Sequence, residues 1–178
     1  GVFLGRNPGS VNNTIDYVTI ASTGNATDFG DQSTAAGGTH GLSNSIRGVI
    51  SGYSDNRIDY ITIASTGNAT DFGDMSTAAP YGSGGSNGTR GVVASVGDME
   101  YITIASTGNA SDFGDLSVDT RSPSGTDNAT RAIFIGGYDG GGSAYSNVIE
   151  YVTIASTGNA TDFGNLWAEL NGVGAASN

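Results

Sequence analysis

The strongest constraint on the fold is a fifteen-residue segment that occurs four times in a chain of 178 residues. Twelve of the fifteen positions are identical in all copies, which read Y-[VI]-T-I-A-S-T-G-N-A-[TS]-D-F-G-[DN] and begin at Tyr17, Tyr60, Tyr101 and Tyr151. Successive copies are 43, 41 and 50 residues apart. Periods of this length are typical of repeat architectures, in which each repeat buries its apolar face against its neighbours.

Each copy predicts a β-hairpin. In the first copy the run from Ile15 to Ser22 is rich in β-branched and aromatic residues, and both of its faces are partly apolar. This pattern favours a small sheet that is covered on both sides. The Gly24-Asn25 pair that follows predicts a two-residue type II′ turn, and Thr27–Phe29 predicts the return strand.

Two further strands are expected in each repeat. A looser apolar run precedes each copy, at Gly1–Gly5, Arg47–Tyr53, Arg90–Ser95 and Arg131–Tyr138, and the variable Gly/Ser/Thr/Asn segment of each repeat supplies the fourth strand. Units of about 40–50 residues with four strands are typical of propeller blades. We therefore predict an all-β fold in which residues 1–178 form a single four-bladed β-propeller, with about four antiparallel strands per blade. One alternative is a β-solenoid. Because four blades is the low end for propellers, the other alternative is a larger ring of which these repeats are a part.

The two ends of the sequence favour a closed ring, either as a whole protein or as a module of a longer one. Each internal apolar run follows a Ser/Asn/Thr stretch that ends in Arg, and the sequence begins just after the place of such an Arg. It ends at Ala175–Asn178, where another such stretch would begin. We expect the C-terminal segment to complete the blade that the N-terminal strand begins, which would leave no open sheet edge.

Composition narrows the functional classes. Seventeen acidic residues stand against six Arg and no Lys, for a net charge of −11. Nucleic-acid binding draws on clustered Lys and Arg, so we expect no nucleic-acid partner. No run approaches the ~20 apolar residues that cross a bilayer, and the lack of Cys excludes thiolate metal sites. We expect no membrane insertion, no metal and no cofactor.

No catalytic residue is expected, and we predict that the chain is not an enzyme. Its carboxylate pairs recur with the framework, as Asp28/Asp31, Asp71/Asp74 and Asp112/Asp115, with Asp162/Asn165 in the last copy. General acid–base catalysis needs one specially placed pair, so these side chains are expected to bond backbone N–H groups in turns. The only His, His40, is expected to be a solvated loop residue. A glycosidase-like propeller would need acidic, Arg and Tyr residues concentrated at one mouth, and no such concentration is present.

The arginines before the apolar runs predict contacts between blades. Arg47, Arg90 and Arg131 occupy the same place in three repeats. We expect them to pair with repeat carboxylates such as Asp59, Glu100 and Glu150, each of which immediately precedes a copy of the strict segment.

The repeats resemble two known groups of proteins. Ile133–Gly137, followed by Ile149–Ile154 and Asp162–Leu166, resembles a kelch blade, although Phe163 stands where kelch repeats have Trp. The closer resemblance, which covers all four repeats, is to repeats of virion proteins from tailed phages, especially aquatic and marine ones; it rests on YITIASTGNATDFGD at Tyr60–Asp74 and the GTRGV lead-in at Gly88–Val92. It implies a kelch-like structural protein of an extracellular virion, in a tail fibre, an appendage or a surface decoration.

Any recognition is expected in the loops, because the invariant segments build the ring. Aromatic residues outside the strict repeat suit contacts with protein or sugar, and they are Tyr53, Tyr81, Tyr138, Tyr145 and Trp167. Together with the resemblance, they predict a structural or adhesive module for host attachment. Its partners would be other virion subunits, in a homo-oligomer within a larger assembly, and a host surface glycan or protein. A secreted carbohydrate-binding propeller and a filament-forming β-repeat protein are the alternatives.

Overall fold

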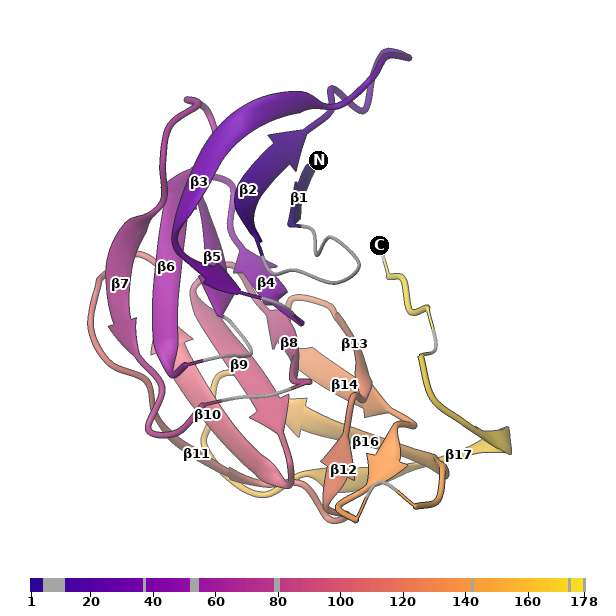
Figure 1. Ribbon diagram of the computed structural model, residues 1–178. Coiled ribbons are helices and arrows are strands. Elements are labelled where there is room, and N and C mark those ends of the chain that lie inside the picture. The colour runs from indigo at the N-terminus through magenta and orange to yellow at the C-terminus, as the bar shows by residue number, and fades with distance from the viewer. Residues whose placement is uncertain are drawn as a thin grey trace.

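A computed structural model describes residues 1–4, 12–36, 38–51, 55–78, 81–141, 143–172 and 174–177. These residues form an all-β fold, and none of them lies in a helix that could cross a membrane. Four antiparallel sheets follow one another along the chain, one for each repeat. Figure 1 shows them arranged along an arc, with the first and last sheets at its two ends.

The second, third and fourth sheets share one plan of four antiparallel strands. The second sheet consists of β4 (His40–Ser43), β5 (Arg47–Ser51), β6 (Arg57–Thr62) and β7 (Thr70–Asp74). The third consists of β8 (Ser83–Ser86), β9 (Arg90–Ser95), β10 (Asp98–Thr103) and β11 (Ser111–Asp115). The fourth consists of β13 (Ser124–Asp127), β14 (Arg131–Ile135), β16 (Ser146–Thr153) and β17 (Thr161–Leu170).

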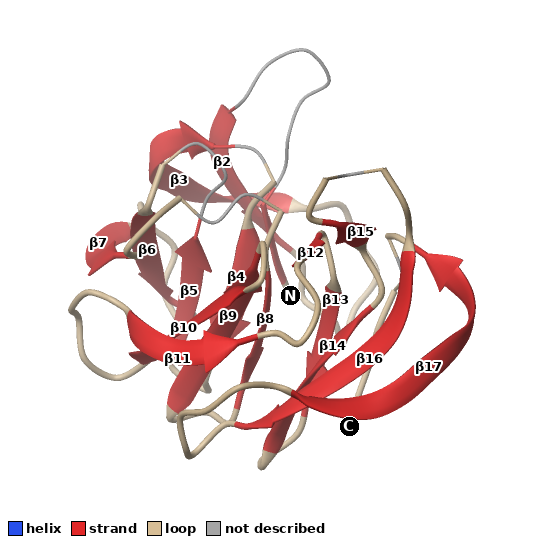
Figure 2. Cartoon of the chain, turned by 90° about the horizontal axis from the view of Figure 1, so that it is seen from below, coloured by secondary structure: helices blue, strands red, loops and turns tan. Residues whose placement is uncertain are grey.

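The first sheet has three described strands, β1 (Val2–Leu4), β2 (Asn12–Tyr17) and β3 (Thr27–Ala36). A separate two-stranded ladder joins β12 (Thr120–Arg121) to β15 (Tyr138–Asp139). Figure 2 shows this ladder beside the fourth sheet. The predicted all-β class is therefore confirmed, as is the plan of four antiparallel strands in three of the four repeats.

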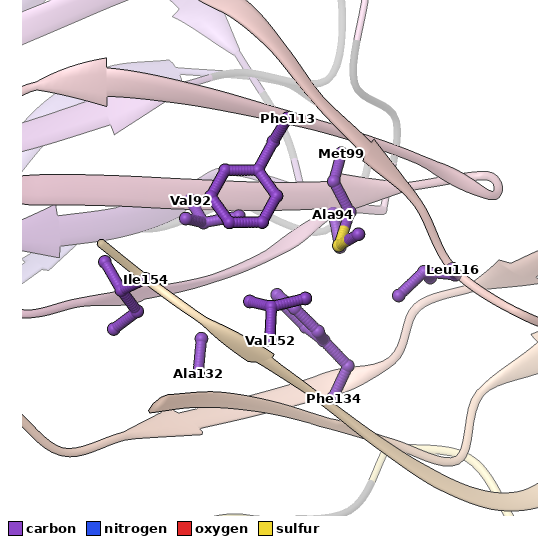
Figure 3. Packing of buried hydrophobic residues seen from close by; sticks show 9 residues of the cluster. All are labelled: Val92, Ala94, Met99, Phe113, Leu116, Ala132, Phe134, Val152 and Ile154. Atoms are coloured by element: carbon purple, nitrogen blue, oxygen red, sulfur yellow. The ribbon is translucent and has the colours of Figure 1, made fainter. Parts of the chain in front are cut away.

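Side chains from neighbouring sheets form the core. Between the third and fourth sheets, Phe113 and Met99 face Phe134 and Val152, and all four are buried (Figure 3). A similar cluster lies between the second and third sheets, and a smaller one between the first and second. Within every sheet, the Tyr and Phe of the strict segment meet edge to face at 5.8–6.0 Å between ring centroids. The two-sided apolar pattern of the strands thus comes from sheets stacked on both sides.

The predicted two-residue hairpin turn is wrong. In the first copy β2 ends at Tyr17, which pairs with Thr27, so nine residues separate the two strands. The last part of this connection, the Ser-Thr-Gly-Asn-Ala run, has the same sequence in every repeat, at residues 22–26, 65–69, 106–110 and 156–160; we call it the linking segment. In the last three repeats the linking segment bonds to the preceding sheet instead of reversing tightly within its own.

Glycine in the outer strands permits this contact. Gly114 has a φ of +134°, in a region that side-chain-bearing residues rarely adopt, and a Cβ there would lie 2.6 Å from the backbone carbonyl of Gly158 in the next repeat. Gly30 and Gly73 occupy the same position against Gly67 and Gly108. The Asp-Phe-Gly motif therefore marks the place where one repeat touches the next.

Buried carboxylates join the sheets as well, but through serines. Asp59 accepts hydrogen bonds from the backbone N–H of Ser33 at 2.9 Å and from its hydroxyl at 2.7 Å. Glu100 accepts from the N–H of Ser76 at 3.0 Å, and Glu150 from the N–H of Ser117 at 2.6 Å. Ser33 lies on the outer strand of the preceding sheet, and Ser76 and Ser117 lie two residues beyond the ends of the outer strands β7 and β11.

The arginines have different partners from those predicted. Arg47 stacks over Tyr60 of its own repeat at 4.5 Å and donates from Nη1 to the carbonyl of Ile104 at 3.2 Å. Arg90 stacks over Tyr101 at 4.1 Å and donates to the carbonyl of Ile154 at 3.2 Å. The expected pairing with Asp59, Glu100 and Glu150 is therefore wrong, because serines already satisfy these carboxylates. Arg47 and Arg90 still join neighbouring sheets.

Closure of the ring by the C-terminal segment is not found in the described part of the chain. Residues 174–177 belong to no strand, and the first sheet has no fourth strand beside β1 among the described residues. The structure shows four consecutive sheets in contact, with one face left uncovered at each end of the series.

Candidate interaction surface

Three of the aromatic residues singled out from the sequence gather around the β12–β15 ladder. Tyr138 pairs with Arg121 across the ladder and forms an isolated bridge with Tyr145. The rings of Tyr138 and Tyr145 are 5.1 Å apart and tilted by 50°. Tyr81 reaches the same place from the segment before β8, where its carbonyl accepts a hydrogen bond of 2.9 Å from the N–H of Ser122.

An insertion specific to the fourth repeat presents Tyr145. The connection between β14 and β16 is longer than its counterparts, and this accounts for the 50-residue spacing of the last two copies. Asp139 orders this loop, because its Oδ1 accepts hydrogen bonds from the N–H of Ser143 at 2.7 Å and of Ala144 at 3.2 Å. The short loop is thus held by its own Asp side chain.

Tyr81, Arg121, Ser122 and Tyr138 line a shallow open pocket, which we call the aromatic pocket. Arg121 also borders a second depression, where Asp98 and Glu100 supply carboxylates. Tyr81 and Ser122 both have positive φ angles, +57° and +53°, and are joined by the hydrogen bond described above. Backbone held in this region costs on the order of 1–3 kcal/mol per residue, and such residues concentrate at functional sites.

Tyr138 is a hydrogen-bond donor at neutral pH. Desolvation raises the pKa of its phenol above the ordinary value of 10.0, and the neighbouring Tyr145 raises it further through its charge and its hydrogen bond. A hydrogen bond with Asn171 acts in the opposite direction. The aromatic pocket therefore offers flat apolar rings, a phenol donor and a guanidinium cation.

The other two predicted residues lie elsewhere. Trp167 is fully exposed on β17, in the irregular stretch between Asn165 and Leu170 where the pairing with β16 shifts. It does not line the aromatic pocket. Tyr53 lies outside the described residues.

Arg121 and Ser122 were missed in the sequence. The sequence does distinguish Arg121. Among the variable segments 32–46, 75–89 and 116–130, only the last contains an Arg. Nothing distinguishes Ser122, because serine is common in all of these segments.

The prediction for His40 is wrong. It lies on β4 as a half-buried residue, with its Nε2 2.7 Å from the hydroxyl of Ser51. Its Nδ1 is buried and has no hydrogen-bond partner among the described residues. Desolvation lowers the pKa of the imidazole from 6.5 to about 4, so the ring is neutral at physiological pH.

The recurrent Asp residues behave as turn residues where their bonds are seen. The Oδ1 of Asp28 accepts from the N–H of Gly30 at 3.1 Å, and Asp162 does the same for Gly164 at 3.0 Å. Across the described residues, no group of three or more His, Cys, Asp or Glu side chains is placed to hold a metal ion.

Neither a scan against models of known protein families nor a search of curated proteins finds a match for this chain.

Proposed function

We propose that the four sheets are blades of a kelch-like β-propeller, and that the protein is a structural and adhesive module of a virion. It would belong to a tail fibre, an appendage or a surface decoration, with many copies on each extracellular particle. The proposal joins the resemblance of the repeats to those of tailed-phage virion proteins with a fold in which the same contacts hold every pair of neighbouring sheets.

The observation that carries the adhesive part is the aromatic pocket. Its residues come from segments that vary between repeats, and the loop with Tyr145 exists in one repeat only. Loops on a rigid repeated scaffold are where proteins place recognition. The pocket combines Tyr rings, on which a sugar ring or an aromatic side chain can stack, with Arg121 as a donor to hydroxyl or carboxylate groups. It fits a host surface glycan or a protein loop.

The experiment is binding of the fluorescently labelled chain to a glycan array and to intact bacterial cells. We expect a double substitution, Tyr81→Ala with Tyr138→Ala, to lower binding at least tenfold, while Ile46→Ala, at an exposed side chain that does not line the pocket, leaves it unchanged. The thermal unfolding midpoint of each variant serves as the folding control. Equal binding by the original chain and the double variant would overturn the role of the pocket.

The same pocket favours a second candidate, a secreted carbohydrate-binding propeller with no particle. Immunogold labelling with an antibody against the chain separates the two. Label on particles supports the virion module, whereas label confined to the soluble secreted fraction supports the second candidate.

A further inference from the structure

One contact between neighbouring sheets is made three times within the chain. In the first instance, Gly67 and Ala69 of a linking segment donate backbone hydrogen bonds of 2.7 Å to the carbonyls of Phe29 and Asp31 on β3. In return, the N–H of Asp31 donates to Oδ1 of Asn68 at 3.1 Å. The second and third instances join 108–110 to β7 and 158–160 to β11, with corresponding distances of 2.7–2.8 Å and 3.1–3.2 Å.

The chain also holds one unused copy of each half of this contact. Among the described residues, no neighbouring sheet bonds to the linking segment of the first repeat, residues 22–26, and no linking segment bonds to the outer strand β17. Phe163 on β17 is 54% exposed, whereas its counterparts Phe29, Phe72 and Phe113 are 1–4% exposed. A Cβ at Gly164 would meet nothing within 4 Å, whereas one at its counterparts Gly30, Gly73 and Gly114 would lie 2.4–2.6 Å from the backbone of the following linking segment.

The apolar surfaces beside these halves are uncovered too. Ile20 is 85% exposed, whereas its counterpart Ile63 is 38% exposed and its counterparts Ile104 and Ile154 are completely buried. On β17, Leu166 is half-buried, whereas Met75 and Leu116 at the same position are buried under the following sheet. Each end of the series thus exposes apolar side chains whose counterparts are buried between two sheets elsewhere in the chain.

The chemistry of the contact is intact at both ends. The linking segment keeps Asn25, the counterpart of Asn68. On β17, Asn165 replaces the Asp of the other repeats, but only the backbone N–H and C=O of that position take part in the contact. Arg131 stacks over Tyr151 at 4.2 Å, as its counterparts do over their own Tyr residues. By the same repeat relation, its guanidinium would face the carbonyl of Ile20 in a following sheet.

We propose that these two ends bind each other between chains, so that the linking segment at 22–26 of one copy docks on β17 of a second copy. The partner is a second copy because the unused halves match in sequence, register and hydrogen-bonding groups. Such a contact is heterologous, and it builds a larger ring if the rotation closes or a filament if it does not. This contact would form the homo-oligomer that is expected from the sequence, and it does not depend on the aromatic pocket.

Trp167 is the main departure at the new contact. It stands where Ser33, Ser76 and Ser117 join the carboxylate of the next sheet. Those bonds use the backbone N–H, which Trp167 retains, and Asp16 supplies the carboxylate on the second copy. The exposed indole would lie at the rim of the interface and add apolar contact there.

Site-directed cross-linking tests this directly, because the chain has no Cys. One preparation carries Ala26→Cys and another carries Asn165→Cys, so neither can link the two halves within one chain. We expect the mixed preparations to give a covalent dimer with a short bismaleimide, and each preparation alone to give much less. The double variant Asp31→Cys with Ala69→Cys is the matched control, since it places the same pair at an internal contact.

The control must cross-link within one chain. If it does and the mixture gives no dimer, the proposal is overturned. If Ala26→Cys and Asn165→Cys placed in one chain then link only within that chain, the two ends instead close a ring inside a single molecule.

Sedimentation velocity supplies the second test. We expect the unaltered chain to form species heavier than 17.8 kDa as its concentration rises. Asn25→Ala should weaken association several-fold, the effect of losing one hydrogen bond of the exposed kind that Asn68 makes, and Ile20→Asp should abolish it. Neither should lower the thermal midpoint of the dispersed chain, whereas Asn68→Ala, the same change at an internal contact, should lower it.

A chain that stays monomeric up to millimolar concentration would contradict the proposal. The adhesive function is tested separately, by glycan and cell binding of the monomeric Ile20→Asp variant, which leaves the aromatic pocket intact.

Discussion

At the scale of single residues, position in the repeat did not predict every environment. Tyr81, Tyr138 and Tyr145 were selected as loop aromatics, and they do meet in one place. His40 was expected in solvent because glycine and polar residues surround it in sequence, yet it lies on a strand. Its ring is covered by other parts of the fold, with Gly82 packed against it. Contacts of this kind join residues that are far apart in the sequence, so no local sequence pattern predicts them.

Burial of His40 predicts a pH-dependent stability. The folded state holds the imidazole neutral with a pKa of about 4, whereas the unfolded chain takes up a proton near pH 6.5. The stabilising contribution is therefore complete above pH 6.5 and is lost as the pH falls toward 4. The loss is about 3 kcal/mol in the free energy of unfolding. Urea unfolding of the original chain and of His40→Gln, at about pH 7.5 and pH 4, measures it.

The many carboxylates titrate in both proteins, so the difference between them isolates His40. We expect the free energy of unfolding to fall less in His40→Gln than in the original chain. Parallel pH profiles would show that the ring is accessible to water and to protons.

At the scale of the element, the strands could be predicted but their connection could not. Alternation and β-branched content marked the apolar runs, and the variable segments indeed supply β4, β8 and β13. By local sequence alone, the Gly24-Asn25 pair favours a tight turn. In the folded chain the equivalent pairs serve a neighbouring sheet, as Asn68 and Asn109 show by bonding Asp31 and Asp74. The preference for a turn was overridden by pairing between repeats.

The outer-strand glycines allow this role to be measured with a matched pair. Gly114→Ala adds a methyl group 2.6 Å from the carbonyl of Gly158, at a φ of +134°. Gly164→Ala adds it at nearly the same φ, +141°, with nothing within 4 Å. Both should lose about 1–2 kcal/mol for the backbone conformation, and only Gly114→Ala should lose roughly a further 1–3 kcal/mol for the clash. Chemical unfolding at a concentration that keeps the chain monomeric gives both values, and equal losses would contradict the role of Gly114 in the contact.

At the scale of the whole molecule, four similar repeats predicted a ring with matched ends, and the structure shows a series with two uncovered ends. Repeats in sequence specify how each sheet meets the next, because those contacts involve identical residues. They do not specify whether the last contact is made within one chain or between two. That choice depends on the angle between successive sheets, and the packing that sets an angle differs between repeats, since Gln32, Met75 and Leu116 are buried at one equivalent position.

A series of stacked sheets should open from its ends. The second and third sheets are packed on both faces, whereas the first and fourth are packed on one face each, so less buried area is lost when an end sheet opens. Hydrogen exchange in a dilute sample should therefore be slowest in β5, β6, β9 and β10 and faster in β2 and β17.

The sharpest comparison is between the amide of Ala26 and those of Ala69, Ala110 and Ala160. The last three donate hydrogen bonds to the preceding sheet. We expect the amide of Ala26 to exchange quickly in the monomer and to become protected as concentration rises and copies associate. Protection of Ala26 that is equally strong at every dilution would mean that the linking segment is already paired within its own chain.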